Sequence, residues 1–150
     1  AQIGETLAEE GEIEGKEKKT TVQEASQFVK DTGVDYLAIS IGSKPGQMEV
    51  LPTIDISLLI EISKTVNIPL VLHGGSGVPI NMYSNLISNG ISKINIDAAI
   101  KNAFRESFIK FYRENNPEID TRVTLNKARE NAQLVVEKYL NIFGSTNMAG

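Results

Sequence analysis

The sequence predicts an α/β fold, the C-terminal half of a TIM (β/α)₈ barrel followed by two extra helices. Two observations support this prediction. Short, nearly continuous apolar runs, typical of strands buried in a parallel sheet, alternate with segments of helical periodicity. Small and polar residues also follow the apolar runs, as they do at the active-site end of a barrel. A doubly wound sheet remains an alternative, because periodicity alone does not count strands.

Three strands are expected, at residues 36–41, 69–72 and 91–96. The first residues, Ala1–Gly4, look like the end of another strand, and the chain begins there without methionine. We therefore expect residues 1–150 to be one half of a barrel domain whose N-terminal half is absent. The strand ends should be adjacent, parallel and in sequence order.

Helix signals separate the expected strands. Thr21 and Glu24 form a capping box ahead of a helix that Gly33 ends. A second helix is expected after Asp55, and a third begins near Pro79. Two longer helices are expected at about 98–112 and 125–142.

Composition excludes several function classes. The net charge of −4 and a pI near 5.1 leave no basic footprint for nucleic acid. The chain has no cysteine, hence no disulfide framework and no thiolate metal site, which is typical of a cytoplasmic protein. Neither a membrane-length apolar run nor a signal-peptide pattern is present.

Chemically useful residues follow the strands at one end. His73 is the only histidine, and although a lone histidine is usually structural, this one precedes a glycine-rich loop at a strand end. Glycines let backbone N–H groups approach an anion closely. We expect the N–H groups of Gly74 to Ser76, with Gly46, to line a phosphate pocket; a simple tight turn is the structural alternative.

Several segments carry a family resemblance. Residues 71–79 (VLHGGSGVP), 92–97 (SKINID) and 32–42, with the terminal FGSTN of 143–147, resemble the class II, metal-dependent ketose-bisphosphate aldolases. That family includes the fructose- and tagatose-bisphosphate enzymes, which serve carbohydrate metabolism and glycolysis. The similarity runs in order over essentially the whole chain.

The resemblance implies a lyase that reversibly cleaves a ketose bisphosphate into dihydroxyacetone phosphate and an aldehyde. A zinc ion held by three histidines would polarise the ketone and stabilise the enediolate. His73 matches one zinc ligand, and Asn95 matches the asparagine that contacts the enediolate.

The same resemblance assigns the binding groups. Gly46, Gly74 and Ser76 match the phosphate and monovalent-cation site, and Asp97 falls where a substrate-contacting aspartate is common. Glu10 matches the mobile-loop glutamate that handles a proton. Family members also form dimers, tetramers or larger assemblies, so a homo-oligomer is expected.

Departures from the family pattern fall on the metal and phosphate sites. Pro45 stands where a zinc-binding histidine is expected, and Ala98 replaces a phosphate-binding threonine. The glycine pair ahead of Glu10 is Leu7-Ala8 here. The third zinc histidine would lie upstream of the chain, so these residues alone do not build a three-histidine site.

Three hypotheses follow. The first is a class II aldolase, or a close relative with an altered metal site or substrate. The second is a degenerate, aldolase-like protein that binds a phosphorylated ligand without zinc catalysis. The third uses Lys44, near the end of a strand, as a Schiff-base nucleophile.

Overall fold

The computed structural model describes residues 2–3, 19–43, 53–115 and 120–148 and divides the chain into two units. The sheet unit, Ala1–Ile96, contains β1 (Gln2–Ile3), α1 (Val22–Thr32), β2 (Leu37–Ile39), α2 (Ile56–Thr65), β3 (Leu70–Leu72), α3 (Tyr83–Ser88) and β4 (Ile91–Ile94). The helical unit, Asp97–Gly150, contains α4 (Ala98–Glu114) and α5 (Thr121–Ile142). Short 3₁₀ turns at Gly75–Gly77 and Ile80–Met82 separate β3 from α3.

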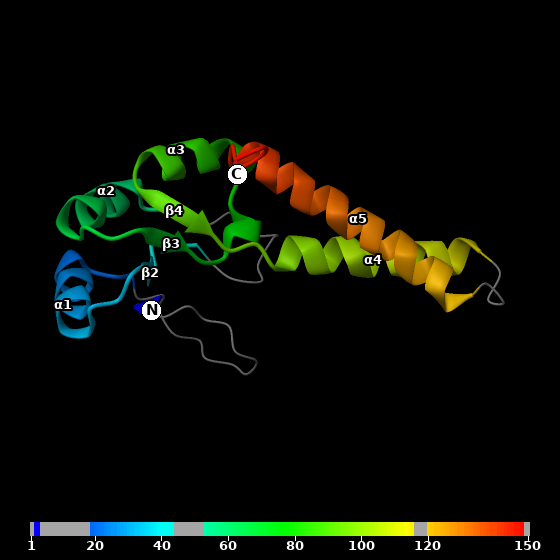
Figure 1. Ribbon diagram of the computed structural model, residues 1–150, viewed down its shortest axis with the longest axis horizontal. Coiled ribbons are helices and arrows are strands. Elements are labelled where there is room, and N and C mark those ends of the chain that lie inside the picture. The colour runs from blue at the N-terminus through cyan, green and yellow to red at the C-terminus, as the bar shows by residue number, and fades with distance from the viewer. Residues whose placement is uncertain (1, 4–18, 44–52, 116–119, 149–150) are drawn as a thin grey trace. The chain divides into compact units, whose positions relative to one another are not determined.

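The described strands form one parallel sheet in the order β1-β2-β3-β4, which confirms the predicted order. Sequential parallel strands joined by right-handed crossovers place their connecting helices on the same side of the sheet. Figure 1 shows α1, α2 and α3 flanking the strands in this way. One face of the sheet is thereby covered by helices, and the carboxyl ends of all the strands meet at one edge.

Apolar side chains from strands and helices form the core of the sheet unit. The fully buried residues include Leu37, Ile39, Leu70 and Leu72 from the strands and Leu59, Ile62, Tyr83 and Leu86 from the helices. Each side chain of this size contributes roughly 1.5–3 kcal/mol when it leaves water. Ala38 and Val71 lie on the other face of the sheet from these strand residues and are also buried. Burial on both faces is what near-continuous apolar strands predict.

The predicted capping box of α1 is present. The Glu24 backbone N–H donates to Thr21 Oγ1 at 3.2 Å, and the Thr21 N–H donates to the Glu24 carboxylate at 2.9 Å. Gly33 ends the helix in the left-handed conformation, with φ of 61°, and its N–H donates to the Val29 carbonyl. Both ends of α1 were therefore predicted correctly.

Asp55 caps α2 as expected. Its Oδ1 accepts the Leu58 N–H at 3.0 Å, and its Oδ2 accepts a hydrogen bond from Lys19 Nζ at 3.0 Å. The hydrogen bond from the Leu58 backbone, followed by that from Lys19, lowers the pKa of Asp55. The helix therefore begins at a carboxylate that the fold keeps ionised.

The third helix differs from its prediction. A helix was expected from Pro79, but a 3₁₀ turn at Ile80–Met82 comes first and the α-helix covers only Tyr83–Ser88. Pro79 has an extended ψ of 138°, and β-branched Ile80 and Asn81 are poor helix formers. The glycine loop after β3 therefore does not lead directly into an α-helix.

The helical unit is an α-helical hairpin, in which α4 and α5 run side by side with the chain reversing between them (Figure 1). α4 ends at Glu114, two residues beyond the predicted end, and α5 begins at Thr121 rather than Leu125. Asp120 explains the earlier start of α5, because its carboxylate accepts the Arg122 N–H at 2.9 Å. No helix in the described part of the chain has the length and apolar composition to cross a membrane.

The cap at Asp55 predicts a pH-dependent stability. A lowered folded pKa means that the charged cap stabilises the protein above the unfolded pKa of about 3.9, and that this stability is lost as the pH falls through the folded value. Asp55→Asn keeps a capping oxygen but loses the charge. We expect it to lower the free energy of unfolding by roughly 0.3–1 kcal/mol at pH 7. The difference should shrink at an acidic pH below the unfolded pKa of about 3.9.

Urea unfolding at both pH values measures this effect. Asp35→Asn, a change at an exposed carboxylate outside the helices, is the matched control. An equal loss for both variants, or a loss for Asp55→Asn that persists at low pH, would contradict the assignment.

Candidate active site

Three polar residues form a row where adjacent strands end. Ser40, His73 and Asn95 follow β2, β3 and β4, and the last strand partners, Ile39, Leu72 and Ile94, are in register. The Asn95 N–H donates to the Leu72 carbonyl at 2.9 Å and so continues the ladder beyond β4. The predicted meeting of His73 and Asn95 at one edge of the sheet is confirmed.

A β-bulge in β4 sets which side chains join this row. Leu70 pairs with Ile91 and Val71 pairs with Lys93, which leaves Ser92 as an extra residue. Lys93 and Asn95 therefore share the face of His73, whereas Ile91 lies on the opposite face with Leu70. Bulges are frequent beside active sites because they redirect side chains in this manner.

The side chains of His73 and Asn95 are in direct contact. Asn95 Nδ2 lies 3.0 Å from His73 Nδ1, and Lys93 Nζ donates a hydrogen bond to Asn95 Oδ1. His73 is half-buried. Burial lowers the pKa of His73, and the positive charge of Lys93 lowers it further, so the ring is neutral at physiological pH. A neutral imidazole serves as a metal ligand or as a hydrogen-bonding group.

The backbone of His73 is also fixed. Ser43 Oγ donates to the His73 carbonyl at 2.6 Å, and Ser43 itself is buried. This residue belongs to the predicted polar rim, but its hydroxyl holds the main chain rather than facing a ligand. The end of β2 thereby supports the end of β3.

The glycine loop is tied to β4 through its second glycine. Gly74 is left-handed, with φ of 67°, and the Gly75 N–H donates to the Asn95 carbonyl at 3.1 Å. Tyr83 OH donates to the Gly75 carbonyl at 2.6 Å. The prediction that all N–H groups from Gly74 to Ser76 face an anion is therefore wrong for Gly75, whose donor is used within the fold. The roles of Gly74 and Ser76 remain predictions.

The remaining predicted site residues lie outside the described residues or in the helical unit. Glu10 and Gly46, together with Pro45 and Lys44, lie outside the described residues. Asp97 begins the helical unit, and its carboxylate, 71% exposed, accepts a hydrogen bond from Lys101 Nζ at 2.8 Å.

Ser40 and Lys93 are further polar residues at these strand ends that the sequence interpretation did not single out. Ser40 is 2% exposed, and its Oγ has no hydrogen-bond partner, although its backbone pairs with Thr20. A buried hydroxyl without a partner is uncommon and marks a place where a polar ligand group gains by binding. The sequence signal that could have identified Lys93 is a charged residue within an otherwise apolar strand.

The metal-ligating capacity of the described residues is small. Within residues 19–43, 53–115 and 120–148 no group of three or more His, Cys, Asp or Glu side chains could hold a metal ion. His73 is the one imidazole, and its Nδ1 already faces the Asn95 amide. A catalytic zinc site needs three protein ligands, so the described residues do not fit one.

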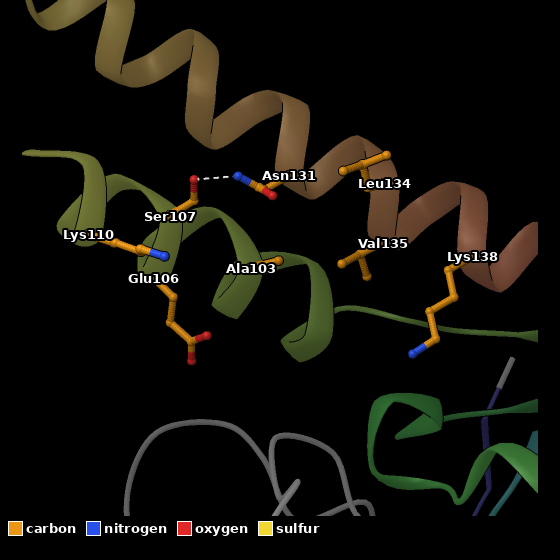
Figure 2. Close-up of a pocket in the computed structure, with 8 residues that line it drawn as sticks. All are labelled: Ala103, Glu106, Ser107, Lys110, Asn131, Leu134, Val135 and Lys138. Atoms are coloured by element: carbon orange, nitrogen blue, oxygen red, sulfur yellow. Dashed lines mark hydrogen bonds between the residues drawn. The ribbon is translucent and has the colours of Figure 1, made fainter.

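The helical unit has a hollow of its own, of about 460 Å³, between α4 and α5. Its lining combines the charged side chains Glu106, Lys110 and Lys138 with the apolar Ala103, Leu134 and Val135. Figure 2 shows the amide of Asn131 donating to Ser107 Oγ, at 2.6 Å. Among the predicted site residues that the structure describes, none lines this hollow.

Comparison with known proteins agrees with the strand-end geometry. The family model described as "Fructose-bisphosphate aldolase class-II" matches residues 1–148. Among solved structures, the YdjI aldolase from Escherichia coli K12 is similar at 28% sequence identity with a TM-score of 0.78, over 89% of this chain and 48% of that chain.

Two further structures agree on the fold. A provisionally named fructose-1,6-biphosphate aldolase from Coccidioides immitis has a TM-score of 0.76 at 26% identity, over 89% of this chain and 46% of that one. Fructose-bisphosphate aldolase from Campylobacter jejuni has a TM-score of 0.70 at 23% identity, over 84% of this chain and 45% of that one. At this level of identity the similarity supports the fold alone. The chain thus spans about half the length of these relatives, and its strands match about half of a TIM barrel.

The contact between the glycine loop and β4 predicts the effect of one methyl group. A Cβ on Gly75 would lie 2.6 Å from Ile94 Cγ2 and 2.8 Å from the Asn95 carbonyl oxygen. Because that oxygen is backbone, the loop must move. We expect Gly75→Ala to destabilise the protein by about 1–3 kcal/mol and to shift the imidazole NMR signals of His73.

Gly33→Ala is the control for this change. Its Cβ would meet nothing within 4 Å, so only the positive φ of 61° opposes the substitution. The control should lose about 1 kcal/mol and leave the His73 signals in place. Unchanged His73 signals in Gly75→Ala would show that the contact does not position the ring.

Proposed function

Because the chain belongs to the class II fructose-bisphosphate aldolase family, we propose that it supplies the C-terminal half of a site for reversible aldol cleavage of a ketose phosphate. The products would be dihydroxyacetone phosphate and an aldehyde. The observation that carries the proposal is the His73–Asn95 contact at the ends of adjacent parallel strands, which is the active-site end of a barrel. Class II aldolases depend on zinc and bind sugar phosphates.

In this proposal Asn95 contacts the oxygen atoms of the enediolate, where developing negative charge favours an amide donor. Gly74, Ser76 and Gly46 bind the phosphate, and Asp97 contacts the sugar. Glu10 transfers a proton. A homo-oligomer, a monovalent cation at the phosphate and a cytoplasmic location are parts of the same proposal.

A second candidate function is binding of a phosphorylated ligand without zinc catalysis. Three observations favour it. Pro45 stands in the place of a ligand histidine, and Ala98, the first residue of α4, has no hydroxyl for a phosphate. His73 Nδ1 also lies 3.0 Å from the Asn95 amide nitrogen. Ligand binding and metal content separate the two candidates.

Phosphate binding is tested first. We expect Ser76→Ala to weaken the binding of dihydroxyacetone phosphate by roughly tenfold, since one hydrogen bond to a charged group contributes about 1.5 kcal/mol. Calorimetric titration gives the dissociation constant. Ser84→Ala, at an exposed position on α3, is the control and should bind as the unmodified protein does. Equal affinities in all three proteins would remove Ser76 from the site.

Metal content is tested next. We expect little zinc and slow bisphosphate cleavage in the unmodified protein, because one histidine of this chain is at most part of a three-ligand site. Pro45→His should raise zinc occupancy, measured by elemental analysis, if the third histidine is supplied from outside these residues. Adding His73→Ala to that variant should remove the gain. Stoichiometric zinc and fast cleavage in the unmodified protein would instead establish an ordinary class II aldolase.

A further inference from the structure

The junction between α3 and β4 contains Asn89, the one asparagine in the sequence that is followed by glycine. Asparagine is a chemically labile residue. A following glycine increases its reactivity, because the glycine amide nitrogen has no neighbouring side chain to hinder its attack on the asparagine side chain. Asn89 is the C-cap of α3, and β4 begins at Ile91. A chemical change at this junction therefore falls directly before the strand that leads to Asn95.

The fold requires glycine at position 90. Gly90 has a positive φ of 116°, a conformation that residues with side chains resist. A Cβ at this position would also lie 2.7 Å from the Cβ of Ser63 on α2. Packing of the junction against α2 thus imposes the residue that most favours attack on Asn89.

In the folded protein both reacting groups are held in the last turn of α3. Asn89 Nδ2 donates to the Asn85 carbonyl oxygen at 2.7 Å and to Asn85 Oδ1 at 2.6 Å. The Gly90 N–H donates to the Ile87 carbonyl at 3.2 Å. For a ring to close, the Gly90 nitrogen must give up its proton and reach Asn89 Cγ. These hydrogen bonds must break first, so the fold opposes a reaction that the local sequence favours.

We propose that Asn89 is a site of spontaneous deamidation and that Asn85 protects it in the folded protein. The Gly90 nitrogen forms a bond to Asn89 Cγ, the bond from Cγ to Nδ2 breaks, and the Gly90 N–H proton leaves with the amide group as ammonia. One water molecule then opens the cyclic imide. Opening at one carbonyl gives aspartate, and opening at the other gives isoaspartate, in which the main chain runs through the side chain. The inference does not depend on the proposed function.

Both products alter the junction. A carboxylate at position 89 has no proton to donate, so it faces the Asn85 oxygens, which are acceptors, without a hydrogen bond. Isoaspartate also adds one CH₂ group to the main chain before Ile91, whose pairing with Leu70 begins the ladder between β3 and β4. Deamidation at Asn89 thus disturbs β4 from the end opposite to Asn95.

Peptide mapping by mass spectrometry measures the conversion of each asparagine. The chain is incubated at mildly alkaline pH, both folded and unfolded in urea. In urea we expect Asn89 to convert faster than any other asparagine, because it alone precedes a glycine. In the folded protein its conversion should be slower than in urea.

Variants at position 85 test the protection. Asn85→Ala removes the side-chain acceptor from an exposed helix position and should raise the folded rate about fivefold, the factor that one hydrogen bond of about 1 kcal/mol provides. Alanine favours helix more than asparagine does, so α3 is not weakened. Asn85→Asp keeps an acceptor and should leave the rate low. Ser84→Ala, at an exposed neighbouring position of α3, is the matched control and should convert as the unmodified protein does.

Each result decides one part of the proposal. All the variants should convert Asn89 at the same rate in urea, where the helix is absent. An unchanged folded rate in Asn85→Ala, or an equal rise in Ser84→Ala, refutes protection by Asn85. Equal rates for the unmodified protein in the folded and unfolded states refute protection by the fold. Earlier conversion of another asparagine in urea refutes Asn89 as the site.

Discussion

The backbone of Asn95 is the constraint on which the site depends. Its N–H continues the ladder from β3, and its carbonyl accepts the Gly75 N–H from the loop that leaves β3. The end of β4 is thus bonded to the chain both before and after His73. Two main-chain hydrogen bonds, rather than flexible side chains, therefore set the position of Asn95 beside His73.

Much of the sheet unit could be predicted from the sequence, because its signals are local. The capping box at Thr21, the left-handed Gly33 and the Asp55 cap each involve residues within a few positions of one another. The bulge at Ser92 could not be predicted, since it depends on the pairing of β4 with β3. In a regular strand, side chains alternate between the two faces, so Ile91 would share a face with Lys93 if the bulge were absent. The third helix was predicted, but its later start at Tyr83 was not, and the hydrogen bond from Tyr83 to the Gly75 carbonyl joins residues on either side of that start.

The candidate site shows the same division. His73 and Asn95 were recognised by type and position, and their contact follows from parallel strands ending at one edge. Lys93, which shares their face of the sheet, donates to Asn95 Oδ1, a contact that the sequence pattern did not indicate. A sequence pattern names the groups in a site. Hydrogen-bond direction, which decides whether an imidazole donates, accepts or binds a metal, needs the fold.

Gly74 and Gly75 are each required to be glycine for a different physical reason. Gly74 adopts a positive φ of 67°, which other residues resist, and Gly75 leaves no room for a Cβ beside Ile94 and the Asn95 carbonyl. Both requirements come from closing the loop onto β4, and they would hold if no phosphate ever bound. The glycine motif therefore argues first for the junction of β3 and β4. What argues for chemistry is the row beside it, where the buried hydroxyl of Ser40 lacks a partner and a neutral imidazole is held by an amide.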